Sequence, residues 1–275
     1  MAGLFERLSG DGARTLVMGV VNVTPDSFSD GGRYRDAAAA VEHARALVAE
    51  GADLLDVGGE STRPGAEPVS ASEEFARVLP VLEGLRAIGV PLSIDTYKAE
   101  VARAALDAGA TLINDVSGGA LDPGILTLAA TRGAPIVLGH LRGTPLTMMG
   151  QVGFSDVVAE VGAELAARIA AAERAGAREI WVDPGLGFGK GTRENLALLR
   201  GLGALGARLG RTLVVGASRK RFLGELTGLP AAERALPSAV AAALAATSGA
   251  DVVRVHDVAA TRQALAIADA VRRAR

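Results

Sequence analysis

Short apolar runs of strand length alternate about eight times with alanine-rich stretches of helical period along this 275-residue chain. The expected strands carry Val, Ile and Leu at near-continuous positions, which is typical of parallel strands covered by helices. They span residues 15–22, 54–59, 91–96, 112–117, 135–141, 180–185, 212–218 and 252–258. The expected helices span residues 37–50, 72–87, 98–108, 123–132, 156–175, 194–209, 231–248 and 259–273.

Eight such units without an internal linker predict one α/β domain over residues 1–275, a closed (β/α)8 barrel of the TIM type. A barrel of this kind typically fills about 250 residues. The alternative is an open, doubly wound sheet, which normally has a glycine-rich dinucleotide-binding turn after its first strand. Here the first strand runs into Val23-Thr24-Pro25, so the barrel is favoured.

Composition excludes several classes of protein. The chain has no cysteine, which rules out disulfides, iron–sulfur clusters and thiolate zinc sites. A net charge of −2 gives no bulk attraction to nucleic acid or to anionic membranes. No apolar run reaches the roughly 18 residues of a membrane span, and the first residues lack the apolar core of a secretion signal. We therefore expect a soluble, cytoplasmic protein without nucleic-acid or membrane partners.

Polar residues close each expected strand, at the end where barrel enzymes of this type carry their active sites. They are Asn22, Glu60, Asp95, Asn114 with Asp115, His140, Asp183, Ser218-Arg219-Lys220, and Arg254 with His256. Each has a structural alternative: Asp95 could cap the next helix, Asn114 could satisfy a loop carbonyl, and Asp183 could open a Pro-Gly turn. An inward carboxylate on an apolar strand is costly without a partner, so the common level of the group indicates a site. Among the other scarce polar residues, His43, Lys98 and Asn195 are expected on the surface or in helix caps.

The chemistry of this set does not suit a hydrolase. No Ser or Cys has a base at nucleophilic spacing, and the histidines lack a metal-ligand spacing such as HExxH. Asp95, Asn114 and Asp183 can grip a planar heterocycle that bears amino and ring N–H donors. A cationic cluster of Arg219, Lys220, Arg254 and His256 can hold a phosphate or diphosphate, and Asn22 or a nearby Asp could bind Mg²⁺ beside it. The combination indicates group transfer with pyrophosphate as the leaving group.

Seven motifs resemble those of the dihydropteroate synthase family, in the family's order and along nearly the whole chain. They are MGVVNVTPDSFSDGG at 18–32, DVGGESTRPG at 56–65, SIDT at 93–96, NDVSGG at 114–119, DPGLGFGK at 183–190, SRK at 218–220 and RVHD at 254–257. Two positions depart from the family pattern. Gly139 stands where the family usually has Met, and Arg221 stands where other members carry Ser.

The resemblance implies a transferase of folate biosynthesis, which condenses 6-hydroxymethyl-7,8-dihydropterin diphosphate with 4-aminobenzoate to give 7,8-dihydropteroate and pyrophosphate. It assigns the pterin to Asp95, Asn114, Asp183 and Lys220. It assigns the diphosphate to Asn22, Arg254 and His256, with Mg²⁺ on Asn22. It assigns the aminobenzoate pocket to Asp26, Phe28, Thr62, Arg63, Pro64, Phe188 and Ser218.

The resemblance also bears on catalysis and assembly. Lys220, Arg254, His256 and Asp95 would carry catalysis by stabilising the departing pyrophosphate and a pterin methylene cation. The family is the target of sulfonamides and tends to dimerise, so a homodimer is expected. Two alternatives stay open: a pterin-binding methyltransferase domain, which shares the barrel but has no use for pyrophosphate, and a non-catalytic pterin-binding paralogue.

Overall fold

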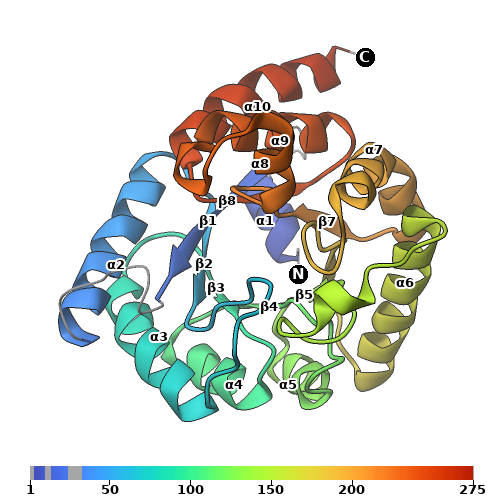
Figure 1. Ribbon diagram of the computed structural model, residues 1–275. Helices are drawn as coiled ribbons and strands as arrows, with labels where there is room; N and C mark the ends of the chain where they lie inside the picture. Colours follow the sequence, from blue (N-terminus) through green and yellow to red (C-terminus); the bar gives the residue numbers. More distant parts are fainter. Residues whose placement is uncertain (1–2, 10–13, 24–32, 275) are drawn as a thin grey trace.

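The computed structural model describes residues 3–9, 14–23 and 33–274, and within these ranges eight parallel strands close into a barrel (Figure 1). Neighbouring strands pair in chain order, and the last returns to the first, where Met18 pairs with Arg254. The strands are β1 (Leu16–Asn22), β2 (Leu54–Gly58), β3 (Leu92–Asp95), β4 (Leu112–Asp115), β5 (Ile136–Gly139), β6 (Ile180–Asp183), β7 (Thr212–Val215) and β8 (Val252–Val255). The predicted (β/α)8 barrel is confirmed.

A ring of helices surrounds the barrel (Figure 1). The ring consists of α2 (Arg33–Ala49), α3 (Ala71–Leu85), α4 (Ala99–Ala108), α5 (Gly124–Arg132), α6 (Val157–Ala175), α7 (Thr192–Leu209), α8 (Arg221–Thr227), α9 (Ala235–Thr247) and α10 (Val258–Arg273). Outward strand residues such as Val57 and Ile94 are fully buried in one cluster with helix residues such as Leu82 and Val101. Full burial of such a side chain contributes roughly 1.5–3 kcal/mol. None of the helices in the described ranges has the length and apolarity needed to cross a bilayer.

A second apolar layer fills the inside of the barrel at the N-terminal ends of the strands. Leu16, Leu54 and Trp181 belong to this cluster, together with Leu4 of the short helix α1 (Leu4–Ser9). The Glu179 carboxylate accepts the backbone N–H of Leu4 at 2.7 Å, which anchors the start of α1 at this end. The interior is therefore a packed core, and polar side chains are confined to the opposite mouth.

Seven of the eight strands end one to three residues before the predicted end. After β4 and β6, the side chain of the last strand residue takes over a backbone hydrogen bond. The Asp115 carboxylate accepts the N–H of Ser117 at 2.8 Å after β4, and the Asp183 carboxylate accepts the N–H of Gly185 at 2.7 Å after β6. Apolar content alone does not show where such a turn begins.

The predicted helix over residues 231–248 is wrong in its first turn. Residues Ala231–Glu233 form the 3-10 turn η3, and α9 begins at Ala235. Pro237 lies in the first turn of α9, where a proline is best tolerated, and it would disfavour a continuous α-helix that began at residue 231.

Three short elements were not predicted at all: α1, α8 and the 3-10 turn η2 (Met148–Gln151). The anchor of α1 is Glu179, 175 positions away in the sequence, so no local pattern shows it. Gly224 lies inside α8 and lowers its helix propensity.

Candidate active site

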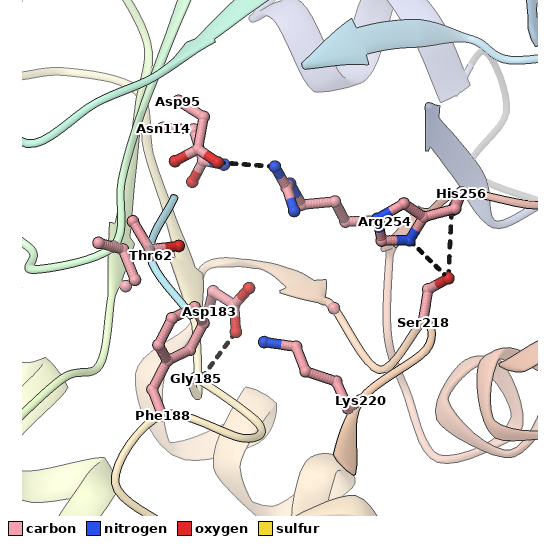
Figure 2. A pocket seen from close by; sticks show the side chains of 13 residues that line it. Thr62, Asp95, Asn114, Asp183, Gly185, Phe188, Ser218, Lys220, Arg254 and His256 are labelled. Carbon is pink, nitrogen blue, oxygen red and sulfur yellow. Dashed lines mark hydrogen bonds and ion pairs between the residues drawn. The ribbon is translucent and has the colours of Figure 1, made fainter. Parts of the chain in front are cut away.

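A pocket opens at the C-terminal ends of the strands, at the mouth opposite α1 (Figure 2). The empty space in it is about 540 Å³, a volume that includes part of the open solvent at the mouth. Its lining residues are Thr62, Asp95, Asn114, Val116, Gly139, Asp183, Gly185, Phe188, Gly216, Ser218, Lys220, Arg254 and His256. Nine of them were assigned to the site from the sequence.

The other predicted site residues do not line this pocket or are not described. Asn22 is half-buried at the end of β1. Arg63 and Pro64 are exposed on the loop after β2. Asp26 and Phe28 lie outside the described residues. The predicted aminobenzoate pocket is therefore present only in part, through Thr62, Phe188 and Ser218.

Arg254 lies between two carboxylates in the wall of the pocket. Its Nε donates to Asp56 at 2.6 Å and its Nη2 donates to Asp95 at 2.7 Å; Figure 2 shows the second contact. Burial disfavours the charge of Arg254, but Asp56 and Asp95 outweigh burial and raise its pKa above the ordinary value. A permanently charged guanidinium is thus held in the pocket wall.

Asp95 and Asp183 present acceptor oxygens from the ends of β3 and β6. Burial raises the pKa of Asp95 to about 7, although the charge of Arg254 opposes this shift. Burial also raises the pKa of Asp183, against the effect of the Gly185 N–H that donates to its Oδ1. Together with the amide of Asn114, these groups suit a ligand that carries several N–H donors.

Lys220 faces Asp183 across the pocket (Figure 2). Its ammonium nitrogen lies 3.8 Å from the ring centroid of Phe188, in a cation–π contact. Burial lowers the pKa of Lys220 to about 8, with Asp183 opposing the shift. Lys220 therefore titrates near neutral pH and can donate to a carbonyl oxygen or ring nitrogen of a ligand.

Ser218 and His256 form a hydrogen-bonded pair, which the sequence pattern did not reveal. The Ser218 hydroxyl oxygen accepts the backbone N–H of His256 at 3.1 Å and lies 3.0 Å from its Nδ1. Burial and the nearby Arg254 lower the pKa of His256 to about 3, so the ring is neutral. A neutral ring carries its proton on either Nδ1 or Nε2; in the tautomer in which the Ser218 hydroxyl donates to Nδ1, the ring proton lies on Nε2 and can be donated to an anion.

The Ser218–His256 pair does not make a nucleophile. A nitrogen with a pKa near 3 is too weak a base to activate a hydroxyl group. The neighbouring Asp257, which might have oriented the ring in a triad, is bonded to Arg219 instead at 3.0 and 2.6 Å. The pair therefore orients a hydrogen-bond donor, in line with the absence of hydrolase motifs from the sequence.

Arg219 holds the turn between Ser218 and Lys220 from outside the pocket, which corrects its predicted place in the cationic cluster. Its φ of 56° is in the left-handed region that a side chain rarely adopts. Its backbone N–H donates to the Ser238 hydroxyl at 2.9 Å, and its guanidinium is bonded to Asp257. These contacts maintain a strained backbone that aims Ser218 and Lys220 inward.

Three strand-end residues predicted for the mouth point away from it. Asp115 directly follows the inward-facing Asn114, and His140 directly follows Gly139, so both lie on the outer side of the sheet because side chains alternate along a strand. Glu60 lies beyond the end of β2 and accepts the Tyr97 hydroxyl at 2.7 Å. The prediction that all the strand-end polar residues share one site is wrong for these three.

Lys190 is a buried residue near the pocket that sequence analysis missed. Its ammonium group lies 2.9 Å from Nδ1 of His140 and 3.0 Å from the carbonyl oxygens of Gly185 and Phe188. Burial lowers its pKa to about 7. Three acceptors match its three N–H donors and fix the loop that carries Phe188. The sequence offered one signal for Lys190: lysine is rare in this chain, which has only three.

Asn195 holds the same loop, and its predicted place on the surface is wrong. The residue is 2% exposed. Its side-chain oxygen accepts the N–H of Gly187 at 2.7 Å, and its amide donates to the Gly191 carbonyl at 2.8 Å. Lys98, predicted for the surface or a cap, is the N-cap residue of α4, and its half-buried ammonium group is paired with Glu60 and Glu74. His43 is exposed, as predicted.

Comparison with known proteins identifies the family of this barrel. The family model described as "Pterin binding enzyme" matches residues 18–256. A dihydropteroate synthase of Synechocystis sp. is 46% identical over 264 residues, which cover 94% of this chain and 91% of that protein. This chain belongs to the dihydropteroate synthase family.

Solved structures of dihydropteroate synthases share the barrel. The Xanthomonas albilineans enzyme, solved with 4-aminobenzoic acid, is 51% identical with a TM-score of 0.88, covering 94% of this chain and 93% of that one. The Yersinia pestis enzyme, solved in a sulfonamide drug complex, is 42% identical with a TM-score of 0.90, covering 96% of each chain. The likeness extends along the whole dihydropteroate synthase fold.

Proposed function

We propose that this protein joins 6-hydroxymethyl-7,8-dihydropterin diphosphate to 4-aminobenzoate and releases pyrophosphate, as a dihydropteroate synthase. The observation that carries the proposal is one pocket in which the acceptors Asp95, Asn114 and Asp183 face the cations Lys220 and Arg254. The acceptors match the amino and ring N–H groups of a pterin. The cations match its carbonyl oxygen and the negative diphosphate.

In this proposal the pterin lies deepest. The 2-amino group and the adjacent ring N–H donate to Asp183 and Asn114, and the ring N–H on the other side donates to Asp95. Lys220 donates to the heterocycle from the opposite wall. Each such charge-assisted hydrogen bond contributes roughly 1.5–3 kcal/mol, so these residues supply both affinity and orientation.

The diphosphate lies toward Arg254 and the Nε2–H of His256. No group of three or more His, Asp or Glu side chains within the described ranges could enclose a metal ion. Mg²⁺ often takes only one or two ligands from the protein and the others from phosphate and water. The amide oxygen of Asn22, at the end of β1, fits such a site. When bound, Mg²⁺ neutralises part of the diphosphate charge.

The 4-aminobenzoate occupies the outer part of the pocket, against Phe188, Thr62 and Ser218. Arg63 and Pro64 lie on the loop after β2, and the family resemblance assigns them, with Asp26 and Phe28, to the same substrate. Sulfonamides, as mimics of 4-aminobenzoate, occupy the same place.

The reaction needs no covalent enzyme intermediate, in keeping with the non-activated Ser218. The bond between the pterin methylene carbon and the bridging oxygen breaks, and its electron pair leaves with pyrophosphate. Arg254 and His256 stabilise the leaving group, while Asp95 and Asp183 stabilise the positive charge that develops on the pterin. The amine nitrogen of 4-aminobenzoate then forms the new C–N bond and loses a proton.

The purified protein, with both substrates and Mg²⁺, tests this proposal through pyrophosphate release. We expect release that depends on 4-aminobenzoate and is inhibited by a sulfonamide. Methyl transfer from methyltetrahydrofolate to a corrinoid, without pyrophosphate release, would assign the pocket to the methyltransferase alternative.

We further propose that the protein is a cytoplasmic homodimer. An apolar stripe on the outer side of α9 and α10 supports the dimer: Leu236, Val240 and Leu244 follow each other at helical spacing, and Ile267 and Val271 are exposed on α10. The cysteine-free composition suits a reducing compartment. Val240→Glu should give a monomer in size-exclusion chromatography with light scattering. A monomeric wild type would contradict the dimer.

A further inference from the structure

Asp56 is a buried carboxylate beneath the pocket, and neither the sequence analysis nor the proposed mechanism gives it a role. It lies on β2, has no exposed surface and is situated behind the described lining of the pocket. Leu54, two positions earlier, belongs to the apolar layer inside the barrel. Because inward side chains recur at every second residue of a strand, Asp56 occupies the next level, between that layer and the pocket.

Both polar partners of Asp56 line the pocket. Its Oδ2 accepts the side-chain N–H of Asn114 at 2.8 Å and the Nε–H of Arg254 at 2.6 Å. Arg254 in turn donates to Asp95 at 2.7 Å. One buried carboxylate thus reaches three residues that would bind substrate. Burial of a charge at this depth is costly, and the pairing with Arg254 offsets that cost.

The hydrogen bond to Asn114 has a chemical consequence. Asp56 forms an ion pair with Arg254 at 2.6 Å, and a carboxylate in such a pair only accepts hydrogen bonds. Asp56 therefore requires the amide nitrogen of Asn114 on its own side. The carbonyl oxygen of Asn114 then faces the pocket as an acceptor, next to the carboxylates of Asp95 and Asp183.

We infer that Asp56 is a positioning residue that sets the orientation of the Asn114 amide and so makes the pocket selective for a heterocycle with an amino group over one with a carbonyl at the same ring position. This inference rests on the proposed function, because it takes a pterin as the ligand. Without a fixed acceptor at position 56, the amide of Asn114 could turn over and present its NH₂ group to a ligand carbonyl.

Calorimetric titration with two ligands tests the inference: 6-hydroxymethylpterin and 6-hydroxymethyllumazine, which has a carbonyl in place of the 2-amino group. The variant is Asp56→Asn, because an amide at position 56 can donate or accept. We expect wild type to prefer the pterin, and the ratio of the two dissociation constants to fall about tenfold in the variant. Equal loss of affinity for both ligands, with the ratio unchanged, would mark a purely structural role and overturn the inference.

The exchanged pair Asp56→Asn with Asn114→Asp keeps the test decisive if the single variant fails to fold. It restores the charge of the buried cluster, and the carboxylate introduced by Asn114→Asp can present only acceptors to the pocket. We expect the exchanged pair to retain the preference for the pterin to within about threefold of wild type, a difference smaller than the tenfold expected from one turned hydrogen bond. Loss of the preference in the exchanged pair would overturn the inference.

Ser93→Ala is the matched control, because Ser93 is buried at the position that pairs with Asp56 on β3. This variant should leave the ratio of the two dissociation constants unchanged. A change in that ratio as large as in Asp56→Asn would show a general disturbance of the barrel and count against a specific role of Asp56. Failure of wild type to bind either ligand would reject the proposed function instead. A wild type that prefers the pterin, beside an Asp56→Asn variant that does so equally, would reject this inference alone.

Discussion

The Arg254 guanidinium lies 2.7 Å from the Asp95 carboxylate, so a residue assigned to the diphosphate holds a residue assigned to the pterin. The same guanidinium is bonded to Asp56. The two halves of the substrate site are therefore linked before any ligand arrives. A change at Arg254 should affect the fold and both halves of the substrate together.

Replacement of Arg254 by Ala should lower the free energy of unfolding by about 3 kcal/mol, because it leaves two poorly solvated carboxylates without their cation. Urea unfolding measures this loss. Affinities for pyrophosphate and for hydroxymethylpterin should both fall, since Asp95 loses its partner. Arg254→Lys keeps a positive charge, so its free energy of unfolding should be closer to that of wild type. It should still bind pyrophosphate poorly, because an ammonium group lacks the planar set of N–H donors of a guanidinium. Unchanged pyrophosphate affinity in both variants would remove Arg254 from the diphosphate site.

Asp183→Asn should weaken pterin binding by one to two decades, about 1.5–3 kcal/mol, without unfolding the protein. A carboxylate can accept two N–H donors from the aminopyrimidinone edge, whereas an amide at this position must direct its own NH₂ group toward one of these two donors. Calorimetric titration with 6-hydroxymethylpterin measures the effect. Asp107→Asn, on the exposed side of α4, is the control and should bind like wild type. Equal affinities in all three proteins would exclude Asp183 from the site.

The pH dependence of kcat/KM should be bell-shaped, with limits set by Asp95 and Lys220. The raised pKa of Asp95, about 7, means that its carboxylate is protonated and cannot accept two donors at lower pH. The lowered pKa of Lys220, about 8, means that its ammonium loses a proton at higher pH. Activity should therefore be greatest between these values.

Lys220→Arg identifies the group behind the alkaline limb. A guanidinium stays charged throughout the accessible range, so the variant should be less active but should lose the decline above about pH 8 that Lys220 causes. Steady-state rates from about pH 5 to 10, a range that brackets the shifted pKa values of Asp95 and Lys220, measure this. An identical alkaline limb in wild type and variant would show that another group sets it.

Lys190→Met should loosen the loop that carries Phe188, because the ammonium group bonds to the carbonyl oxygens of Gly185 and Phe188. Hydrogen exchange should be faster at the amides of residues 186–188 and unchanged in α10, and KM should rise more than kcat falls. Lys98→Met is the control, because it removes a half-buried lysine that is paired with Glu60 and Glu74 outside the pocket; exchange at residues 186–188 should stay unchanged in it. Uniformly faster exchange throughout the barrel would indicate a general loss of stability instead.

Sequence alone could predict the barrel and most of the site, for a physical reason. Parallel strands covered by helices must be apolar, so Asp95, Asn114 and Asp183 stand out at the end of such runs. The side of the sheet on which a given side chain lies is harder to predict, because successive side chains of a strand alternate between the two sides. Asp115 and His140 were therefore placed on the wrong side, one residue from inward-facing neighbours.

The parts of the site that the sequence could not predict depend on contacts between residues that are distant in the chain. Asp56 and Arg254 are 198 positions apart in the chain, and the Ser218–His256 pair spans 38 positions. Such distances are set by barrel closure and by the turn at Arg219, which no local pattern encodes. Lys190 was overlooked because a lysine ordinarily lies on the surface.

The joining of a pterin to an arylamine in this pocket, with loss of pyrophosphate, is tested by the amount of each product that the purified protein forms from dihydropterin diphosphate and 4-aminobenzoate. Mass spectrometry and a pyrophosphate assay measure the two products. We expect 7,8-dihydropteroate and pyrophosphate to form in equal molar amounts, over many turnovers per protein chain. Pyrophosphate without the coupled pterin product, or tight pterin binding without turnover, would contradict it.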